Sequence, residues 1–143
     1  MKLTKHTDYA LRILIYSSLQ PKERLLSIQE VTDVYELSRN HVMKIVQKLG
    51  QEGYLTTIRG KGGGFHLGRK PEDINLGELI SKLEPSMKLV NCKEPVCRIS
   101  PACRLQSVLS EAMSSFQEVL NSYTLADLVD NRDELSNLLA ISA

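Results

Sequence analysis

The sequence predicts a mainly α-helical fold with a small β-hairpin wing, in which a winged helix-turn-helix DNA-binding domain precedes a long dimerisation helix. Two short amphipathic segments separated by a three-residue turn lie within residues 28–49. A basic, glycine-rich turn separates two β-rich segments between residues 54 and 67, and apolar residues recur at helical spacing from 105 to 123. We therefore expect a DNA-binding region at residues 1–70, and a region of residues 71–143 with a cluster-binding loop and the dimerisation helix.

The first half of the chain is expected to begin with three helices. Residues 7–19 have apolar side chains at helical spacing, and Pro21 follows them. Ser27 and Glu30 have the spacing of a capping box, which predicts a second helix ending near residue 34 or 35. Ser38 offers the N-cap of a third helix, whose apolar face would be Val42, Ile45, Val46 and Leu49. The second and third helices then form a helix-turn-helix.

The outward face predicted for the third helix carries side chains that are able to bond base edges and phosphates. These are Arg39, Asn40, Met43, Lys44 and Gln47. Asparagine is suited to adenine and arginine to guanine, so this face is typical of a recognition helix. The alternative is an ordinary solvent-exposed amphipathic helix, because two short helices joined by a tight turn are common.

A basic hairpin directly after this helix is typical of a wing. Residues 54–58 and 65–67 have strand composition, and the turn between them carries Arg59 and Lys61 among four glycines. Glycine lets a backbone approach phosphates closely, and the two cations supply charge. A nucleotide-binding loop is disfavoured because Gly-Lys-Ser/Thr is missing and Phe65 replaces the last glycine of a G-x-G-x-x-G pattern.

The charge of the chain is divided unevenly between its halves. Residues 1–70 have 12 Lys and Arg against 6 Asp and Glu, a net charge of +6, whereas residues 71–143 have 6 against 11, a net charge of −5. A basic first half favours a polyanionic partner, although a charge of this size is also found on ordinary solvated surfaces.

The second half is expected to hold three further helices. Residues 75–84 would form a short helix, and Ser100-Pro101 would begin a long one as its N-cap and first residue. The long helix has an apolar stripe of about six turns, which is wide for one small domain to cover, so part of it is expected at a dimer interface. Packing wholly against its own domain is the alternative. Thr124 and Asp127 predict a last short helix.

All three cysteines lie within twelve positions, in the pattern C-x4-C-x5-C: Cys92, Cys97 and Cys103. Thiolates bind soft metals and iron–sulfur clusters, and nearby Lys93, Arg98 and Arg104 favour their deprotonation. Zinc is the main rival, but the chain has neither a closely spaced cysteine pair nor a fourth cysteine. A disulfide with one thiol left over, or no metal at all, are the remaining alternatives.

Other classes of function have little support. The first residues have no apolar signal region and no apolar run approaches the length of about 18 residues needed for a membrane span, so we expect a cytoplasmic protein. Neither paired acids nor a nucleophile with its base stands out, and His6, His41 and His66 are isolated in the sequence. We therefore expect no enzyme.

Several segments together carry a family resemblance. They are LT at 3–4, TDYALR at 7–12, VTDVY at 31–35, LSRNH at 37–41, RGK with GG at 59–64, LEP at 83–85, LVNC at 89–92, PACRL at 101–105 and YTLADLV at 123–129. The Asn-Cys and Pro-Ala-Cys contexts are the most specific. On these residues the chain resembles the Rrf-type winged-helix regulators over nearly its whole length, and within them the iron–sulfur repressors that sense nitric oxide.

The resemblance implies a homodimeric repressor that binds palindromic double-stranded DNA while its iron–sulfur cluster is intact and releases detoxification genes when nitric oxide attacks that cluster. It also implies a fourth ligand, Asp8, donated by the partner subunit. Three cysteines and a carboxylate suit either a [2Fe–2S] or a [4Fe–4S] cluster. Regulators of cluster biogenesis in the same family have a histidine three residues after the last cysteine, and Gln106 at this position argues against that subgroup.

The resemblance and the motifs together give the candidate sites. The metal ligands are Cys92, Cys97, Cys103 and Asp8. The candidate DNA contacts are Arg12, Ser27, Ser38, Arg39, Asn40, His41, Lys44, Arg59, Lys61, Gly62 and Gly63. An iron- or redox-responsive regulator of the same family and a zinc-stabilised DNA-binding protein remain the alternatives.

Overall fold

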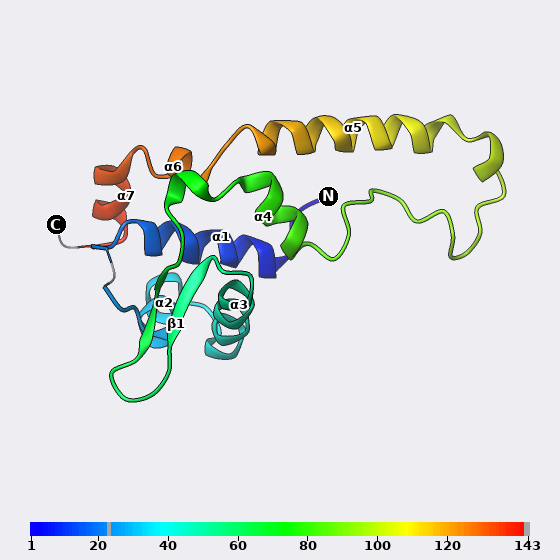
Figure 1. Cartoon of the computed structure of the whole chain (residues 1–143). Helices are drawn as coiled ribbons and strands as arrows, with labels where there is room; N and C mark the ends of the chain where they lie inside the picture. The colour runs from blue at the N-terminus through cyan, green and yellow to red at the C-terminus, as the bar shows by residue number, and fades with distance from the viewer. Residues whose placement is uncertain (23, 142–143) are drawn as a thin grey trace. The chain divides into compact units, whose positions relative to one another are not determined.

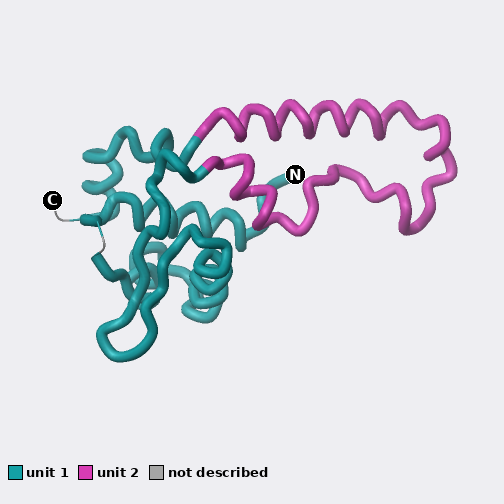
Figure 2. Tube along the Cα trace, viewed as in Figure 1, with its two compact units in different colours: residues 1–74, 124–143 teal, residues 75–123 magenta. Residues whose placement is uncertain are grey.

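The computed structural model describes residues 1–22 and 24–141, which form two compact units (Figures 1 and 2). Unit 1 comprises residues 1–74 and 124–143, and unit 2 comprises residues 75–123. A division of function near residue 70 stays a prediction, because compactness indicates which segments pack together and not which of them contacts DNA.

The core of unit 1 forms around α1 (Lys5–Ser18), which begins where the Thr4 hydroxyl accepts a hydrogen bond from the Thr7 N–H at 3.3 Å. Its side chains Ala10, Ile13 and Leu14 are fully buried. Apolar burial of this kind stabilises the fold by about 1.5–3 kcal/mol for each large side chain. Sequence periodicity predicted this helix and its apolar face.

The helix-turn-helix consists of α2 (Ile28–Tyr35) and α3 (Arg39–Gln51), as predicted. Glu36 ends α2 in the left-handed conformation with φ 53°, and the Leu37 N–H donates to the Thr32 carbonyl at 3.1 Å. The predicted apolar residues of α3 are all buried: Val42, Ile45, Val46 and Leu49. They hold α3 against α1, α2 and the first strand of the wing.

One detail of the predicted capping box differs in the structure. The Ser27 hydroxyl accepts from the Glu30 N–H at 3.0 Å, as expected at an N-cap. The Glu30 carboxylate, however, accepts from the Tyr16 hydroxyl at 2.8 Å and from Arg24 at 3.0 Å. The Glu30 carboxylate therefore bonds Tyr16 of α1 instead of the N-terminal end of its own helix, where the local spacing had placed it.

The wing is an antiparallel pair, β1 (Leu55–Ile58) and β2 (Gly64–Leu67), with Leu55 opposite Leu67 and Ile58 opposite Gly64. Leu26, just before α2, pairs with Phe65 through two backbone hydrogen bonds, with N···O distances of 2.8 and 2.9 Å. Phe65 is 1% exposed. The hairpin is therefore fastened to the helix-turn-helix near its middle, and its tip extends beyond the helices (Figure 1).

Unit 1 is completed by segments distant in the sequence. A 3₁₀ turn, η1 (Pro71–Asp73), leads out of the wing, and the predicted capping box starts α6 (Leu125–Leu128). A further helix, α7 (Arg132–Leu138), was not predicted, and Asn131 at its start makes no side-chain cap. Arg132 fixes α7 to the end of α1 by donating to the Ser18 carbonyl at 2.9 Å and the Leu19 carbonyl at 3.2 Å.

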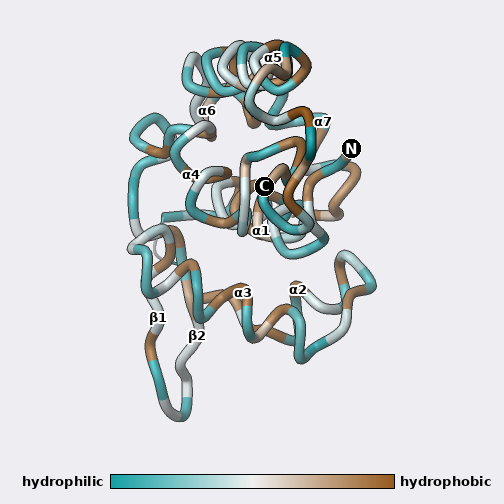
Figure 3. The backbone as a smooth tube through the Cα atoms, turned by 90° about the vertical axis from the view of Figure 1, so that its right-hand side faces the viewer, coloured by the Kyte–Doolittle hydropathy of each residue, from teal (hydrophilic) through white to brown (hydrophobic). Residues whose placement is uncertain are grey.

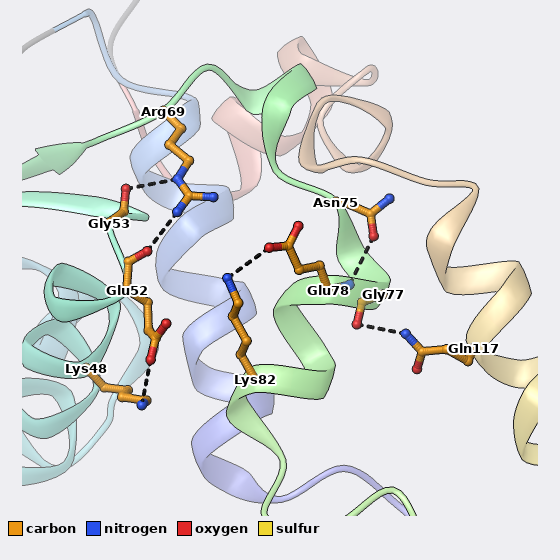
Figure 4. A network of polar contacts seen from close by, with 9 residues as sticks. All are labelled: Lys48, Glu52, Gly53, Arg69, Asn75, Gly77, Glu78, Lys82 and Gln117. Atoms are coloured by element: carbon orange, nitrogen blue, oxygen red, sulfur yellow. Dashed lines mark hydrogen bonds and ion pairs between the residues drawn. The ribbon is translucent and has the colours of Figure 1, made fainter.

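Unit 2 is built on α4 (Leu76–Leu83) and the long helix α5 (Arg104–Asn121). Asn75 caps α4 by accepting from the Glu78 N–H at 3.0 Å, and its amide donates to the Asn121 carbonyl at 2.7 Å. The Gln117 amide donates to the Gly77 carbonyl at 3.0 Å (Figure 4). These bonds fix the C-terminal end of α5 to the start of α4.

The start of the long helix was predicted wrongly. Ser100 and Pro101 belong to a separate 3₁₀ turn, η2 (Ser100–Ala102), rather than to the first turn of α5. Cys103 is extended, with φ −77° and ψ 120°, so helical hydrogen bonding cannot run through it and α5 begins at Arg104. The last cysteine therefore directly precedes the helix.

The described part of α5 has no buried residue, although apolar residues recur along it (Figure 3). Leu105, Val108 and Val119 are 58–60% exposed. An apolar stripe left open along one helix is what the predicted dimer interface would present in a single chain. Within the described residues no helix is both long enough and apolar enough to cross a membrane.

We predict that the free energy of unfolding falls as the pH rises from about 10 to about 12. Burial, with a hydrogen bond to Glu30, raises the pKa of Tyr16 to about 12, and burial raises the pKa of Tyr35 to about 12. The folded state then keeps both protons to a higher pH than the unfolded chain, so this stability is present below pH about 10 and lost through about 12. Denaturant titrations of wild type and Tyr16→Phe at several pH values between about 9 and 12 would measure this change in the free energy of unfolding.

Tyr16→Phe should flatten this alkaline loss, whereas Tyr123→Phe, which changes an exposed ring, should leave it unchanged. Equal slopes for wild type and Tyr16→Phe would contradict the assignment.

Candidate functional site

The exposed face of α3 carries the predicted recognition residues. Arg39, Asn40, Lys44 and Gln47 are exposed, and Met43 is 48% exposed, on the side opposite the buried face. Arg39 also donates to the Gln29 side chain of α2 at 2.8 Å. Sequence reasoning missed this bond, because Gln29 lies ten residues away and only the helix-turn-helix geometry brings it near. Asn40, Lys44 and Gln47 remain accessible to a partner.

His41 differs from the exposed residues beside it, because it is partly buried. It lies edge-on to the Tyr9 ring, with centroids 5.1 Å apart, and its centroid is 6.2 Å from that of His6. The predicted DNA contact at His41 thus also packs α3 against α1.

Ser27 and Ser38, both predicted DNA contacts, occupy N-cap positions. The Ser27 hydroxyl accepts from the Glu30 N–H at 3.0 Å, and the Ser38 hydroxyl accepts from the His41 N–H at 3.5 Å. A capping hydroxyl satisfies one of the unpaired N–H groups that begin a helix. Both side chains are exposed, so capping does not prevent contact with a partner.

Arg12, another predicted DNA contact, is paired with Asp8, a predicted metal ligand. Two guanidinium nitrogens donate to the two carboxylate oxygens at 3.0 and 3.1 Å, and the Arg12 guanidinium lies 5.5 Å from the Tyr9 ring centroid. The hydrogen bond to Asp8 raises the pKa of Arg12. Both side chains are nearly half exposed, at 45% and 44%, so the pair is solvated and contributes little to stability.

The tip of the wing carries the predicted cations in an open position. Arg59 and Lys61 are exposed, and the tip is coloured mainly hydrophilic to intermediate in Figure 3. Gly62 has φ 78°, in the left-handed region that glycine adopts without strain. A Cβ on Gly63 would collide with the Ile58 carbonyl. The predicted role of these glycines at DNA thus coincides with a steric need of the turn itself.

The cysteine loop, residues 92–103, is a succession of hydrogen-bonded turns. The Cys97 N–H donates to the Cys92 carbonyl at 3.0 Å, and the Ser100 N–H donates to the Cys97 carbonyl at 3.1 Å. Before them, the Asn91 side chain accepts from the Lys93 N–H at 3.0 Å. The three cysteines are free thiols and each is half-buried.

The donor chemistry of this loop fits a thiophilic metal centre. Three thiols without a disulfide lie in one loop, and sulfur ligands select soft metals such as zinc and the iron of iron–sulfur clusters. In the described ranges 1–22 and 24–141, however, no three His, Cys, Asp or Glu side chains are gathered closely enough to hold a metal ion. Ligation would therefore have to draw the successive turns together.

A groove of about 710 Å³ runs between the segment before the loop and α5. Cys92 and Gln106 both line it, together with apolar side chains such as Leu109 and Met113. Gln106, three residues after the last cysteine, thus lines the same groove as the first cysteine.

Residues 3–131 match the Rrf2 family, described as iron-dependent transcriptional regulators. The chain belongs to the Rrf2 family. Regulators of this family bind DNA, are typically dimers and are not enzymes. The resemblance inferred from the sequence is confirmed at the level of the family.

Solved structures of the same fold include several regulators. IscR of T. potens is 26% identical, with 94% of this chain and 90% of that chain covered and a TM-score of 0.74. CymR of B. subtilis, the global cysteine regulator, is 27% identical, with 92% and 98% covered and a TM-score of 0.70. An oxidised form of CymR from Staphylococcus aureus shares the fold at 24% identity, with 91% and 97% covered and a TM-score of 0.72. These likenesses confirm the winged-helix fold class.

We predict that the two roles of Ser38 are separable. Ser38→Ala should lower the free energy of unfolding by about 1 kcal/mol, because the N-cap is lost. Ser38→Asp keeps a capping oxygen and should restore that stability, yet its charge beside the exposed face of α3 should weaken DNA binding. Denaturant unfolding and DNA titration measure the two effects. Loss of DNA binding in Ser38→Ala at unchanged stability would show that the hydroxyl is not a cap.

Proposed function

We propose that this Rrf2 regulator is a repressor of the NsrR type, whose iron–sulfur cluster senses nitric oxide and which derepresses nitric-oxide detoxification genes. It would act in the cytoplasm as a homodimer on a palindromic operator. The observation that carries the proposal is the loop of three free, half-buried cysteines that leads straight into α5 in a chain of an iron-dependent regulator family.

The ligands in this proposal are Cys92, Cys97, Cys103 and, from the partner subunit, Asp8. A bound iron–sulfur cluster supplies iron at which nitric oxide reacts. A carboxylate is a harder ligand than a thiolate and holds soft iron more weakly, so the Asp8 side would be the accessible one. To bind the metal, Asp8 would have to give up its two hydrogen bonds to Arg12. This exchange costs little free energy because the Asp8–Arg12 pair is solvated.

Gln106 supports the nitric-oxide assignment over the cluster-biogenesis one. A glutamine amide is a weak metal ligand compared with a histidine ring, so the residue three positions after Cys103 is unsuited to complete the set. The missing ligand must then come from elsewhere, which is the role given to Asp8.

The dimer in this proposal is made by α5. Leu105, Val108 and Val119 leave an apolar stripe exposed along one helix, and a second copy of the same helix would cover it. A twofold dimer presents two copies of α3 and of the wing, so its operator would be palindromic.

The two DNA-contacting elements should fail in different ways. Asn40→Ala should cost about 1–3 kcal/mol on the operator and relax base preference, because a base-edge contact is lost. Lys61→Ala should weaken binding to all sequences alike and lower the salt slope by about one ion. Titrations with operator and scrambled duplexes at several salt concentrations measure both, with Lys82→Ala as the charge-matched control in unit 2. Unchanged discrimination by Asn40→Ala would remove α3 from base recognition.

The proposed sensing function is tested with anaerobically purified protein. Wild type should show visible absorption, bind its operator and lose both on titration with nitric oxide. Each of the three cysteine variants, Cys92→Ala, Cys97→Ala and Cys103→Ala, should lack the chromophore, because two thiolates and a carboxylate do not retain the cluster. Each should remain folded by circular dichroism. A colourless protein that binds zinc would establish the zinc alternative. Release of the operator DNA on oxidation or iron removal, but not on addition of nitric oxide, would establish the redox- or iron-responsive alternative.

The role of Asp8 is tested by the visible spectrum and iron content of mixed dimers. Pairing an Asp8→Ala subunit with a Cys97→Ala subunit leaves one site with three cysteines and, across the dimer, an intact Asp8. A native-like spectrum at half the iron content would support ligation across subunits. A spectrum equal to that of the Asp8→Ala homodimer would rule it out.

A further inference from the structure

A cationic cavity of about 470 Å³ lies in unit 1, apart from the recognition helix and the tip of the wing. Its walls come from the end of α1, the segment after it, the last residues of β2 with the segment that follows, and Arg132. Thr56 and His66, which face each other in the hairpin, line it near the base of the wing.

The cavity is lined by positive charge. Five of its lining residues are cationic: Lys22, Arg24, Arg69, Lys70 and Arg132. None of the described lining residues is acidic. Among the described residues only Arg24 of these five is paired with a carboxylate, that of Glu30 at 3.0 Å. Four like charges therefore surround one concavity in a chain whose overall charge is only +1.

Two of the guanidinium groups are held in place without being neutralised. Arg69 donates to the Glu52 carbonyl at 2.8 Å and the Gly53 carbonyl at 3.3 Å (Figure 4). Its guanidinium also lies 4.4 Å from the Tyr54 ring centroid. Arg132 donates to two carbonyls at the end of α1 in the same way. A neutral carbonyl satisfies an N–H but leaves the full charge on the group, so both cations are fixed before any ligand arrives.

These bonds explain why the two arginines are present but not why two lysines lie beside them. Lys22 and Lys70 are exposed, and their ammonium groups make no hydrogen bond or ion pair within the described part of the chain. Repulsion among like charges around one concave site costs stability, and a bound anion removes that cost.

We propose that this cavity binds a phosphate-type oxyanion. Rigid guanidinium groups recognise two oxygens of such an anion, and flexible ammonium groups complete its charge. Such a phosphate has two sources, a free anion in solution and the backbone of bound DNA that passes the base of the wing. The site goes beyond the proposed function, because it uses neither the cysteines nor the predicted base contacts.

Free phosphate is tested on wild type and on the double variant Lys22→Ala/Lys70→Ala, in cluster-free protein. Inorganic phosphate, compared with chloride at equal ionic strength, should raise the Tm of wild type by mass action. The double variant should bind phosphate about tenfold more weakly or worse, since a charge-assisted contact is lost with each lysine. Lys82→Ala/Lys88→Ala, which removes the same charge from unit 2, should respond as wild type does.

The DNA source is tested with the same proteins and a mixed-sequence duplex, because phosphate contacts do not depend on sequence. If DNA supplies the phosphate, the double variant should lower the salt slope by up to about two ions, and the control should not. A phosphate-dependent rise in Tm that requires the two lysines supports a free anion as the ligand. A reduced salt slope of DNA binding in the double variant, with no phosphate-dependent rise in Tm, supports the DNA backbone as the ligand. If neither response depends on Lys22 and Lys70, the cavity is not an oxyanion site. A failure of nitric-oxide sensing affects neither result.

Discussion

The paired backbone hydrogen bonds between Leu26 and Phe65 are the constraint on which the geometry of unit 1 depends. Two strands of four residues are marginal as an isolated hairpin, and this pairing gives β2 a second neighbour. The same bonds fix the residue that leads into α2, whose Glu30 is in turn held by Tyr16 of α1. The recognition helix, the wing and α1 thus form one cross-linked body, and the cations of the wing tip keep a defined position relative to α3.

The parts of the fold that depend on local chemistry could be predicted from the sequence. N-caps at Ser27, Ser38 and Asn75 and the apolar face of α3 all lie within one or two helical turns of the residues they govern. Two of the differences from the sequence predictions occur where distant partners decide. Glu30 leaves its expected cap for Tyr16, and α7 is held by an arginine that bonds the end of α1 rather than by a cap.

The candidate sites likewise differ in whether their residues are close together along the chain. Three cysteines in one loop are visible in the sequence because they are close together along the chain, and so is the exposed face of α3. The pairing of Asp8 with Arg12 is local too, but each had been assigned separately, one to the metal and one to DNA. The cationic cavity could not be found from sequence, because Lys22, Lys70 and Arg132 come from three separate parts of the chain.

The junction at Cys103 gives α5 the mechanical properties of a lever. The helix has 18 residues and is therefore about 27 Å long. Its far end is anchored to α4 through Asn75 and Gln117, and its near end directly follows a cysteine in extended conformation. A tilt of about 10° around the anchored end would displace the cysteine end by about 5 Å over that length. If Cys103 is a cluster ligand as proposed, a small change in the bonding of its sulfur would thus be converted into a displacement comparable to a full turn of helix.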